Sequence, residues 1–322
     1  MFAFVIRRVA LSLPVLLVAS IIVFVGVSAT SDPTARLRFS RDPGVIRAET
    51  ERLGLDKPVT TRYVKWLSSF TRGDWGQSFV DRERVKDKIT RALWTTLQLM
   101  FFGVTVSALI AIAIGIYSAT RQYSMGDVVF TSASFVGLSM PPFWFGLILI
   151  DLVTFKLPRG LGWDSTPLFS IGLHSSGNSG FNVDYLRHLA LPVATLTVQI
   201  IASWSRYQRS AMLDVMGSDY IRTAKAKGLP RRRVVLKHGL RNALIPLVTI
   251  MAVDIGLLFG GLVITEQIFS IPGMGRVFLR ALENGDTNVM LPWLMVTAAF
   301  IISFNLLADV AYGLLDPRIR LA

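Results

Sequence analysis

Long runs of residues without a charged side chain limit what this chain can fold into more than any other feature. The first run covers residues 9–29, and runs of similar length recur through all 322 residues. About 20 consecutive apolar residues span a bilayer as a helix, whereas a barrel strand needs only about ten. Because lipid gives the backbone no hydrogen-bond partners, these runs predict an all-α membrane protein.

Six transmembrane helices are expected from this pattern. The candidate spans are residues 9–29, 92–120, 128–155, 189–205, 242–265 and 287–315. Pro141 and Pro142 interrupt the third span, where we expect a helix kink, with a moving gate as the alternative. The small residues that end the first run would also fit a cleavable signal peptide. The length of that run and the spans after it favour a retained helix.

The distribution of Lys and Arg predicts the orientation of the spans. With the N-terminus inside, fifteen basic residues fall in cytoplasmic segments and five in the two short external loops. Short loops rich in Lys and Arg stay in the cytoplasm, so we expect both termini there. The net charge of +13 is then accounted for by topology and by contact with membrane lipid, and no nucleic-acid binding is expected.

The sequence divides into three parts. Residues 1–29 hold the N-terminus and first span, and 30–91 form an external segment with short amphipathic helices. Residues 92–322 form a five-helix core that includes a cytoplasmic loop at 206–241. The second external loop, 158–186, is rich in Gly and Ser, which predicts an irregular and mobile segment.

Helix signals occur within the external segment. Asp42-Pro43 predicts a helix start and Gly54 a helix stop, while Pro58 can begin a second helix with one apolar face. That face can rest on the membrane or the helix bundle, and it can also form a docking surface for an external partner.

No sequence motif for catalysis or nucleotide binding is present. The chain has no GxxxxGK[ST] phosphate loop, no HExxH and no GxSxG. It has no cysteine, and its three histidines lack the spacing of metal ligands. We therefore expect no enzyme activity, metal or cofactor in this chain, so energy for uphill transport would come from a partner or an ion gradient.

The cytoplasmic loop is the most informative segment. Its residues from Asp219 to Lys227 suit a short helix, because the acid lies at the start and the lysines near the end. Gly228 suits a left-handed stop, and Pro230 prevents continuation before a second helical stretch opens at Arg231. Such a helix can insert into a groove on a partner, or it can rest on anionic lipid. The residues alone leave both alternatives open.

This loop resembles the coupling-helix motif, or EAA loop, of permease subunits in bacterial binding-protein-dependent ABC importers. The likeness is greatest to the oligopeptide and dipeptide permeases of the OppB/DppB type. The small residue and the glycine of the motif fall on Ala224 and Gly228. Arg222 and Thr223 stand where the general motif has Glu and Ala, and the spacing from Gly228 to Pro246 is longer. Both departures resemble the peptide-permease branch.

Other stretches carry the same resemblance, in order, across nearly the whole chain. They are residues 7–8, 54–58, 62–63, 73–78, 139–144, 188–192, 266–275 and 316–318. The resemblance implies the type I ABC importer permease fold, in the bacterial inner membrane. It also implies a pathway shared with a second permease, two cytoplasmic ATPase subunits that bind ATP and Mg, and an external peptide-binding protein.

Alternatives to peptide import stay open at this point. The cargo could be nickel or another small solute, because permeases for these cargoes look alike. An ion-coupled secondary transporter would need midplane coupling groups in repeated broken helices, and only Asp254 fits the midplane.

Candidate functional residues fall into three sets. Coupling to the ATPase is assigned by the resemblance to Asp219, Arg222, Ala224, Lys225, Ala226 and Gly228. Pathway lining or helix packing is expected of Asp254, Gly256, Gly260, Pro141 and Pro142. External-loop roles are expected of Glu266, Pro272, Gly273 and Gly275. Asp254 could line the pathway or hydrogen-bond a neighbouring helix, and the glycines could pack against a partner permease or within the chain.

Overall fold

The computed structural model describes residues 2–30, Gly44, Arg47, Thr50, Glu51 and 54–315. Within this part of the chain the structure is helical, and the β structure is an isolated bridge between Gln77 and Arg84. The helices are α1 (Phe2–Thr30), α3 (Val59–Thr71), α4 (Val85–Thr120), α5 (Met125–Ser139), α6 (Pro142–Leu149), α7 (Leu157–Leu161), α8 (Val183–Met216), α9 (Asp219–Ala226), α10 (Arg231–Arg233), α11 (Arg241–Ile268), α12 (Met274–Glu283) and α13 (Thr287–Leu315). π-Helical turns cover Ile150–Lys156 and Val234–Leu240.

The predicted spans are confirmed as helices. Five helical stretches, which lie within α1, α4, α8, α10–α11 and α13, are long and apolar enough to cross a membrane, and a bent pair gives up to six. The ends differ from the sequence prediction in one informative place. α8 continues to Met216, well past Ser205, where the sequence predicted the cytoplasmic loop to begin. Arg206 and Arg209 do not stop a helix, because a charged residue is a good helix former once it lies outside the hydrocarbon.

The chain divides into two compact units. The first comprises Leu97–Ile271 and the residues from Ser303 on, and the second comprises Phe2–Thr96 and Pro272–Ile302. α4 and α13 each contribute residues to both units.

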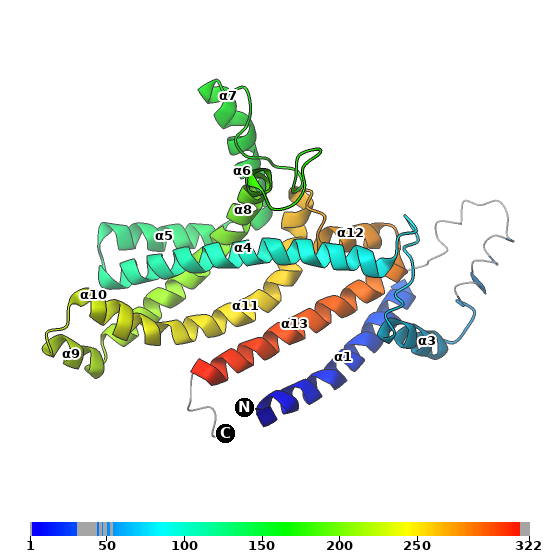
Figure 1. Ribbon diagram of the computed structural model, residues 1–322, viewed down its shortest axis with the longest axis horizontal. Coiled ribbons are helices and arrows are strands. Elements are labelled where there is room, and N and C mark those ends of the chain that lie inside the picture. Colours follow the sequence, from blue (N-terminus) through cyan, green and yellow to red (C-terminus); the bar gives the residue numbers. More distant parts are fainter. Residues whose placement is uncertain (1, 31–43, 45–46, 48–49, 52–53, 316–322) are drawn as a thin grey trace. The chain divides into compact units, whose positions relative to one another are not determined.

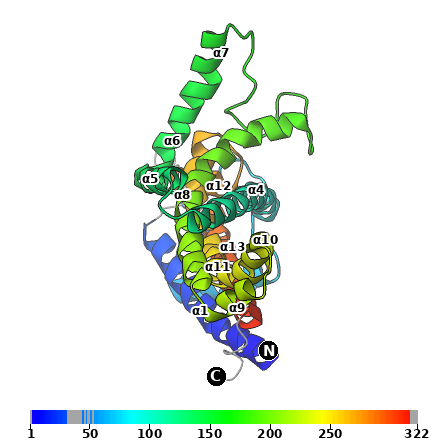
Figure 2. The same ribbon diagram turned by 90° about the vertical axis from the view of Figure 1, so that its left-hand side faces the viewer.

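α8 is the central helix of the first unit. α5, α6 and α11 all pack against it (Figures 1 and 2). Glycines allow the close approach: a Cβ built on Gly115 of α4 would lie 2.6 Å from Gln208, and one on Gly137 of α5 would lie 3.3 Å from Ala202. Small residues at such crossings let helix backbones come together, which drives helix association in membranes.

The third span is broken rather than kinked. α5 ends at Ser139, Met140 and Pro141 are extended, and α6 begins with Pro142 at a bend of 105°. The sequence predicted a kink within one helix, whereas the structure has two separate helices at this point. A single proline removes one helical hydrogen bond, but the residue before a proline also avoids helical geometry, so the tandem Pro141-Pro142 ends one helix and starts another. After α7 the chain is irregular to Asn182, so the irregular segment is shorter than the predicted 158–186, because α7 covers its first residues and α8 begins at Val183.

Two contacts decide whether the bent pair crosses the membrane. In the second unit Ser78, before α4, donates to Asp286, after α11. In the first unit Arg231, after α8, donates to the carbonyl of Thr120 at the end of α4. Contacting residues lie on one side of a membrane, so an even number of spans must separate each pair. If the other stretches all cross, both counts are even only when the bent pair crosses once, which favours six spans over five.

In the second unit, α3 packs along α1 through aromatic side chains. The Tyr63 hydroxyl and Ser20 Oγ are 2.7 Å apart, and the Phe24 ring lies 5.5 Å from both Tyr63 and Trp66. Tyr63 and Trp66 of the predicted apolar face thus pack on the chain's own first span, while no described residue of α3 is fully buried. Gly54 is left-handed, with φ 64°, as its predicted role as a helix stop requires. The predicted helix start at Asp42-Pro43 lies outside the described residues.

Candidate functional site

The cytoplasmic-loop helix predicted from the sequence is confirmed as α9, and its end is built around Gly228. This glycine has φ 72°, and its N–H donates to the Lys225 carbonyl at 3.0 Å. The Leu229 N–H donates back to the Ala224 carbonyl at 3.4 Å. These two bonds form a Schellman motif, in which a left-handed residue satisfies the last carbonyls of a helix. Gly228 therefore sets where α9 stops and where the chain turns back.

α9 is held to the first unit by a small apolar cluster. Ile221 and Ala224 are buried with Val234, and Val215 and Met216 pack against them. Ala224, one of the predicted coupling residues, therefore faces inward and positions the helix rather than presenting a surface.

The other predicted coupling residues lie on the exposed face of α9 and its C-terminal turn. Exposed residues here are Asp219, Tyr220, Arg222, Thr223, Lys225, Ala226, Lys227 and Gly228. Arg222 and Asp219 form an ion pair at 3.4 Å, but their side chains are 75% and 95% exposed, so it contributes little stability. The face carries three cations against one acid. It is small, convex and basic, a shape that suits a groove with acidic walls.

α9 and the short helix α10 that follows it are each tied to a longer helix. The Tyr220 hydroxyl accepts from Asn242 of α11 at 2.8 Å, and Arg231 donates to the Thr120 carbonyl of α4 at 2.9 Å. A displacement of α9 would therefore act directly on α11, and on α4 through the turn that leads to α10.

A buried ion pair joins α5 to α8. Arg209 donates from Nε and from a terminal guanidinium nitrogen to the two oxygens of Asp127, each at 2.8 Å. The Asp127 side chain is only 4% exposed, and the Tyr123 N–H also donates to it. Sequence reasoning missed this pair because its members lie in different helices. The sequence does carry a local signal for the start of α5, because Ser124 caps the helix by accepting from the Asp127 N–H.

The break between α5 and α6 is capped by α8. The Gln199 side chain donates its Nε2 hydrogen to the Met140 carbonyl at 2.7 Å. That carbonyl lies at the break caused by Pro141 and Pro142, so the amide supplies a bond that the helix cannot make. Gln199 was not among the predicted residues, since an isolated glutamine in an apolar span gives no pattern.

Asp254 forms the interhelical hydrogen bond that was one of its two expected roles. The Trp204 indole Nε1 donates to Asp254 Oδ2 at 2.7 Å, and Trp204 is fully buried in α8. Gly256, also on α11, is buried. Gly260 lies in α11, but its surroundings are outside the described residues. The side chain of Asp254 thus fastens α11 to α8.

Asp254→Leu is expected to destabilise the protein by about 1–3 kcal/mol, because it leaves the buried Trp204 N–H without an acceptor. Asp254→Asn keeps an acceptor oxygen and should cost much less. The measurement is the thermal midpoint of the purified protein in detergent. If Asp254→Asn keeps the wild-type midpoint but loses transport, the acid lines the pathway and the hydrogen bond is not its main role.

Of the four residues predicted to have external-loop roles, Glu266 belongs to the first unit and the other three belong to the second. Glu266 is fully buried in the last turn of α11, inside the helix rather than beyond it. In the second unit Pro272 is exposed, Gly273 precedes α12, and Gly275 is buried in its first turn.

The histidines are less scattered than the sequence suggested. His174 and His188 both approach Asp184, with Nδ1–oxygen distances of 3.8 and 3.7 Å. Ser175 holds this carboxylate with its N–H and its hydroxyl. Among the described residues, no group of three or more His, Cys, Asp or Glu side chains could hold a metal ion.

Comparison with known families gives matches over nearly the full length. Residues 111–321 match the model of the binding-protein-dependent transport system inner membrane component. Residues 1–100 match the model of the N-terminal part of such membrane components.

Curated relatives are similar over almost their whole length. The oligopeptide transport system permease protein AppB of Bacillus subtilis is 40% identical, over 99% of this chain and 100% of the relative. The dipeptide transport system permease protein DppB of Escherichia coli is 34% identical, over 99% of each.

Among solved structures, the MetNI methionine ABC transporter in an inward-facing conformation is similar in fold. Its TM-score is 0.55 at 18% identity, over 71% of this chain and 96% of that chain. An amino acid ABC transporter gives a TM-score of 0.50 at 12% identity, over 70% and 93%.

Proposed function

This chain belongs to the family of binding-protein-dependent transport system inner membrane components, and from that membership we propose that it is a transmembrane permease subunit of an ATP-driven peptide importer. It is a multi-pass inner-membrane protein. The AppB, OppB and DppB relatives, at 34–40% identity over nearly the whole chain, support peptide as the cargo.

The mechanism rests on α9, a short helix whose outer face is exposed and whose inner residues pack in the apolar cluster around Ile221. Two cytoplasmic ATPase subunits bind ATP and Mg, and each accepts one such helix from a permease. Closure of the ATPases displaces α9, and its bond to α11, together with the bond from α10 to α4, carries that movement into the spans. The helix bundle is the two-state element, and ATP and the loaded binding protein bias its equilibrium.

In the proposed orientation both termini and α9 are cytoplasmic. Six spans place the two termini on one side, and the excess of Lys and Arg in the segments joined to α9 makes that side the cytoplasm. The connections before α4 and after α11 are then external, where a peptide-binding protein would deliver its cargo.

The transport pathway is shared with a second permease in a heterodimer. We assign Asp254 and Gly256 to packing of α11, Gly260 to close approach of the partner permease, and Pro141 with Pro142 to the break in the third span. Glu266, Pro272, Gly273 and Gly275 organise the external turn between α11 and α12.

Uptake by the reconstituted complex tests this function. The chain would be placed in proteoliposomes with its partner permease, ATPases and peptide-binding protein, and uptake of a labelled oligopeptide measured with and without ATP. We expect uptake that requires both ATP and the binding protein. ATP-dependent uptake of nickel but not of peptide would overturn the cargo. Uptake driven by a proton or sodium gradient without the ATPases would overturn the mechanism.

A further inference from the structure

A pocket in the second unit lies where two spans end. Its volume is about 440 Å³, within the range of small-molecule sites. Phe24 and Val27, near the end of α1, line it together with Thr287 and Leu291 at the start of α13. The candidate span of α1 ends at Ala29, and that of α13 begins at Thr287. The pocket is therefore at the level where the hydrocarbon of the bilayer meets the headgroups.

Aromatic rings of α3 and of the loop after it form another wall of the pocket. The Trp66 ring centroid lies 5.5 Å from Phe24 of α1 and also 5.5 Å from Phe70. The rings of Phe70 and Trp75 are stacked 5.1 Å apart, and the Trp75 indole N–H donates to the Phe70 carbonyl at 3.1 Å. Tryptophan gathers at membrane interfaces, because its ring is apolar and its N–H is polar. This wall thus has the composition of a membrane interface.

Three cations line the same pocket: Lys57, Arg62 and Lys65. Lys57 and Lys65 are exposed, and within the described part of the chain neither side chain forms an ion pair or hydrogen bond. The Arg62 guanidinium lies 6.0 Å from the centroid of the Phe24 ring, which brings its charge to the end of α1. The two lysine ammonium groups are therefore available to an incoming anion.

Two acids, Glu51 and Asp74, also line the pocket. Both are exposed, and Asp74 accepts from the Gly76 N–H at 3.2 Å within its own turn. Neither acid is paired with one of the three cations among the described residues. The described lining thus carries three positive charges against two negative ones, and it favours an anion.

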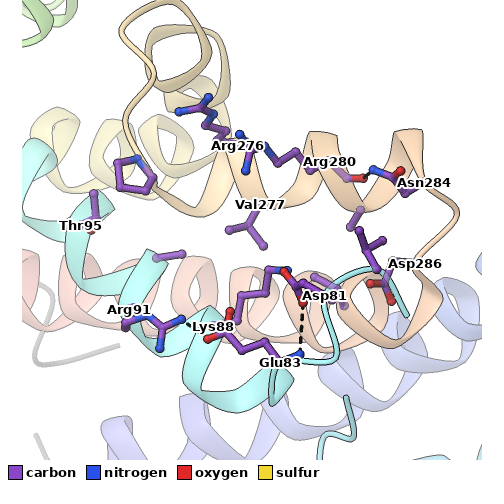
Figure 3. Close-up of a pocket in the computed structure, with 15 residues that line it drawn as sticks. Asp81, Glu83, Lys88, Arg91, Thr95, Arg276, Val277, Arg280, Asn284 and Asp286 are labelled. Atoms are coloured by element: carbon purple, nitrogen blue, oxygen red, sulfur yellow. Dashed lines mark hydrogen bonds and ion pairs between the residues drawn. The ribbon is translucent and has the colours of Figure 1, made fainter. Parts of the chain in front are cut away.

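Another charged pocket of this unit shows the contrast. Figure 3 shows it between the start of α4, the loop before α4, and α12, which carries the exposed Arg280. There Lys88 donates to Asp81, and Arg91 donates to Glu83. These bases already have acidic partners within the chain, whereas Lys57 and Lys65 have none among the described residues.

We propose that the pocket at the ends of α1 and α13 binds the headgroup of a phospholipid. The phosphate lies among Lys57, Arg62 and Lys65, and the acyl chains follow the apolar side of α1. Leu17 and Ile21 lie on the side of Phe24, two turns and one turn closer to the bilayer centre, and are 50% and 42% exposed. A free phosphate would use the cations but not this apolar surface. The inference rests on the location in the membrane and not on the cargo.

Lipid binding to the purified complex tests this proposal. The complex is stripped of lipid in detergent and titrated with phosphatidylglycerol, and native mass spectrometry gives the Kd of each bound lipid. Lys57→Glu with Lys65→Glu should raise one of these Kd values by about tenfold or more, since each basic residue at a membrane surface contributes about fivefold. Lys57→Arg with Lys65→Arg should keep it, because guanidinium also binds phosphate.

Arg72→Glu with Lys86→Glu is the matched control, since both residues are exposed bases of the same unit that do not line the pocket. This control should keep every Kd of the wild type. Equal losses in the two Glu double variants would mean general electrostatic attraction and would overturn the site. An unchanged set of Kd values in Lys57→Glu with Lys65→Glu would also overturn it.

Two further measurements separate a lipid from other ligands. Glycerol phosphate, which has no acyl chains, should bind at least about tenfold more weakly than phosphatidylglycerol. An equal Kd would assign the pocket to a soluble phosphate and contradict the proposal. The proposal also fails if Lys57→Glu with Lys65→Glu keeps the affinity for lipid and instead loses affinity for the peptide-binding protein, since the pocket would then belong to a protein interface.

Discussion

Replacing Gly228 with proline is expected to abolish ATP-dependent peptide uptake. Gly228 has φ 72°, whereas the proline ring fixes φ near −65°. Proline also removes the N–H that bonds the Lys225 carbonyl. The end of α9 must then reorganise, and Leu229 leaves its place against the Ile221 cluster. We expect a loss of about 3 kcal/mol or more in local stability, seen as uptake near background.

Two milder variants control for this effect. A Cβ at Gly228 would meet no atom within 4 Å, so substitutions there act through the backbone alone. Asn tolerates the left-handed conformation, so Gly228→Asn should keep most of the uptake, while Gly228→Ala should cost about 1–2 kcal/mol and reduce it. Co-purification of the ATPases shows whether the complex still assembles. Normal uptake by Gly228→Pro would show that the geometry of α9 is not part of coupling.

Breaking the Asp127–Arg209 pair is expected to destabilise the protein by about 3–5 kcal/mol. Asp127→Leu leaves the Arg209 guanidinium, which is 25% exposed, without its carboxylate, and it also leaves the Tyr123 N–H without its acceptor. Because the pair joins α5 to α8, the loss should appear as a lower thermal midpoint and as poor recovery from detergent extraction. Arg209→Met should be destabilised for the same reason, since the carboxylate of Asp127 is buried.

The double variant Asp127→Leu with Arg209→Met distinguishes a buried pair from ordinary packing. With both charges removed, no buried charge is left unpaired, and most of the lost stability should return. Additive losses in the double variant would mean that each side chain acts through separate contacts.

Much of the fold could be predicted from the apolar runs, because hydrophobic length is almost the whole requirement for a membrane helix. α9 was predictable for a different reason: Asp219, Gly228 and Pro230 are local start and stop signals that need no tertiary context. The pattern of basic residues also predicts that both termini are cytoplasmic, and this orientation stays a prediction.

What the sequence could not predict depends on pairing between helices. Gln199 and Met140 meet only because the break between α5 and α6 packs on α8, and no spacing along the chain indicates that contact. The same holds for Asp127 and Arg209. The extension of α8 to Met216 was missed because loss of hydrophobicity ends a span without ending a helix. The inward position of Ala224 likewise follows from the cluster around Ile221.

A cross-linking measurement tests the central claim, that α9 is the element on which the ATPases act. The chain has no cysteine, so Lys225→Cys provides a unique site on the exposed face of α9 for a maleimide–benzophenone reagent. In the assembled complex, illumination should link this chain to an ATPase subunit. The same reagent on Arg280→Cys should give no such product. Absence of the α9 product from a complex that still imports peptide with ATP would contradict the account.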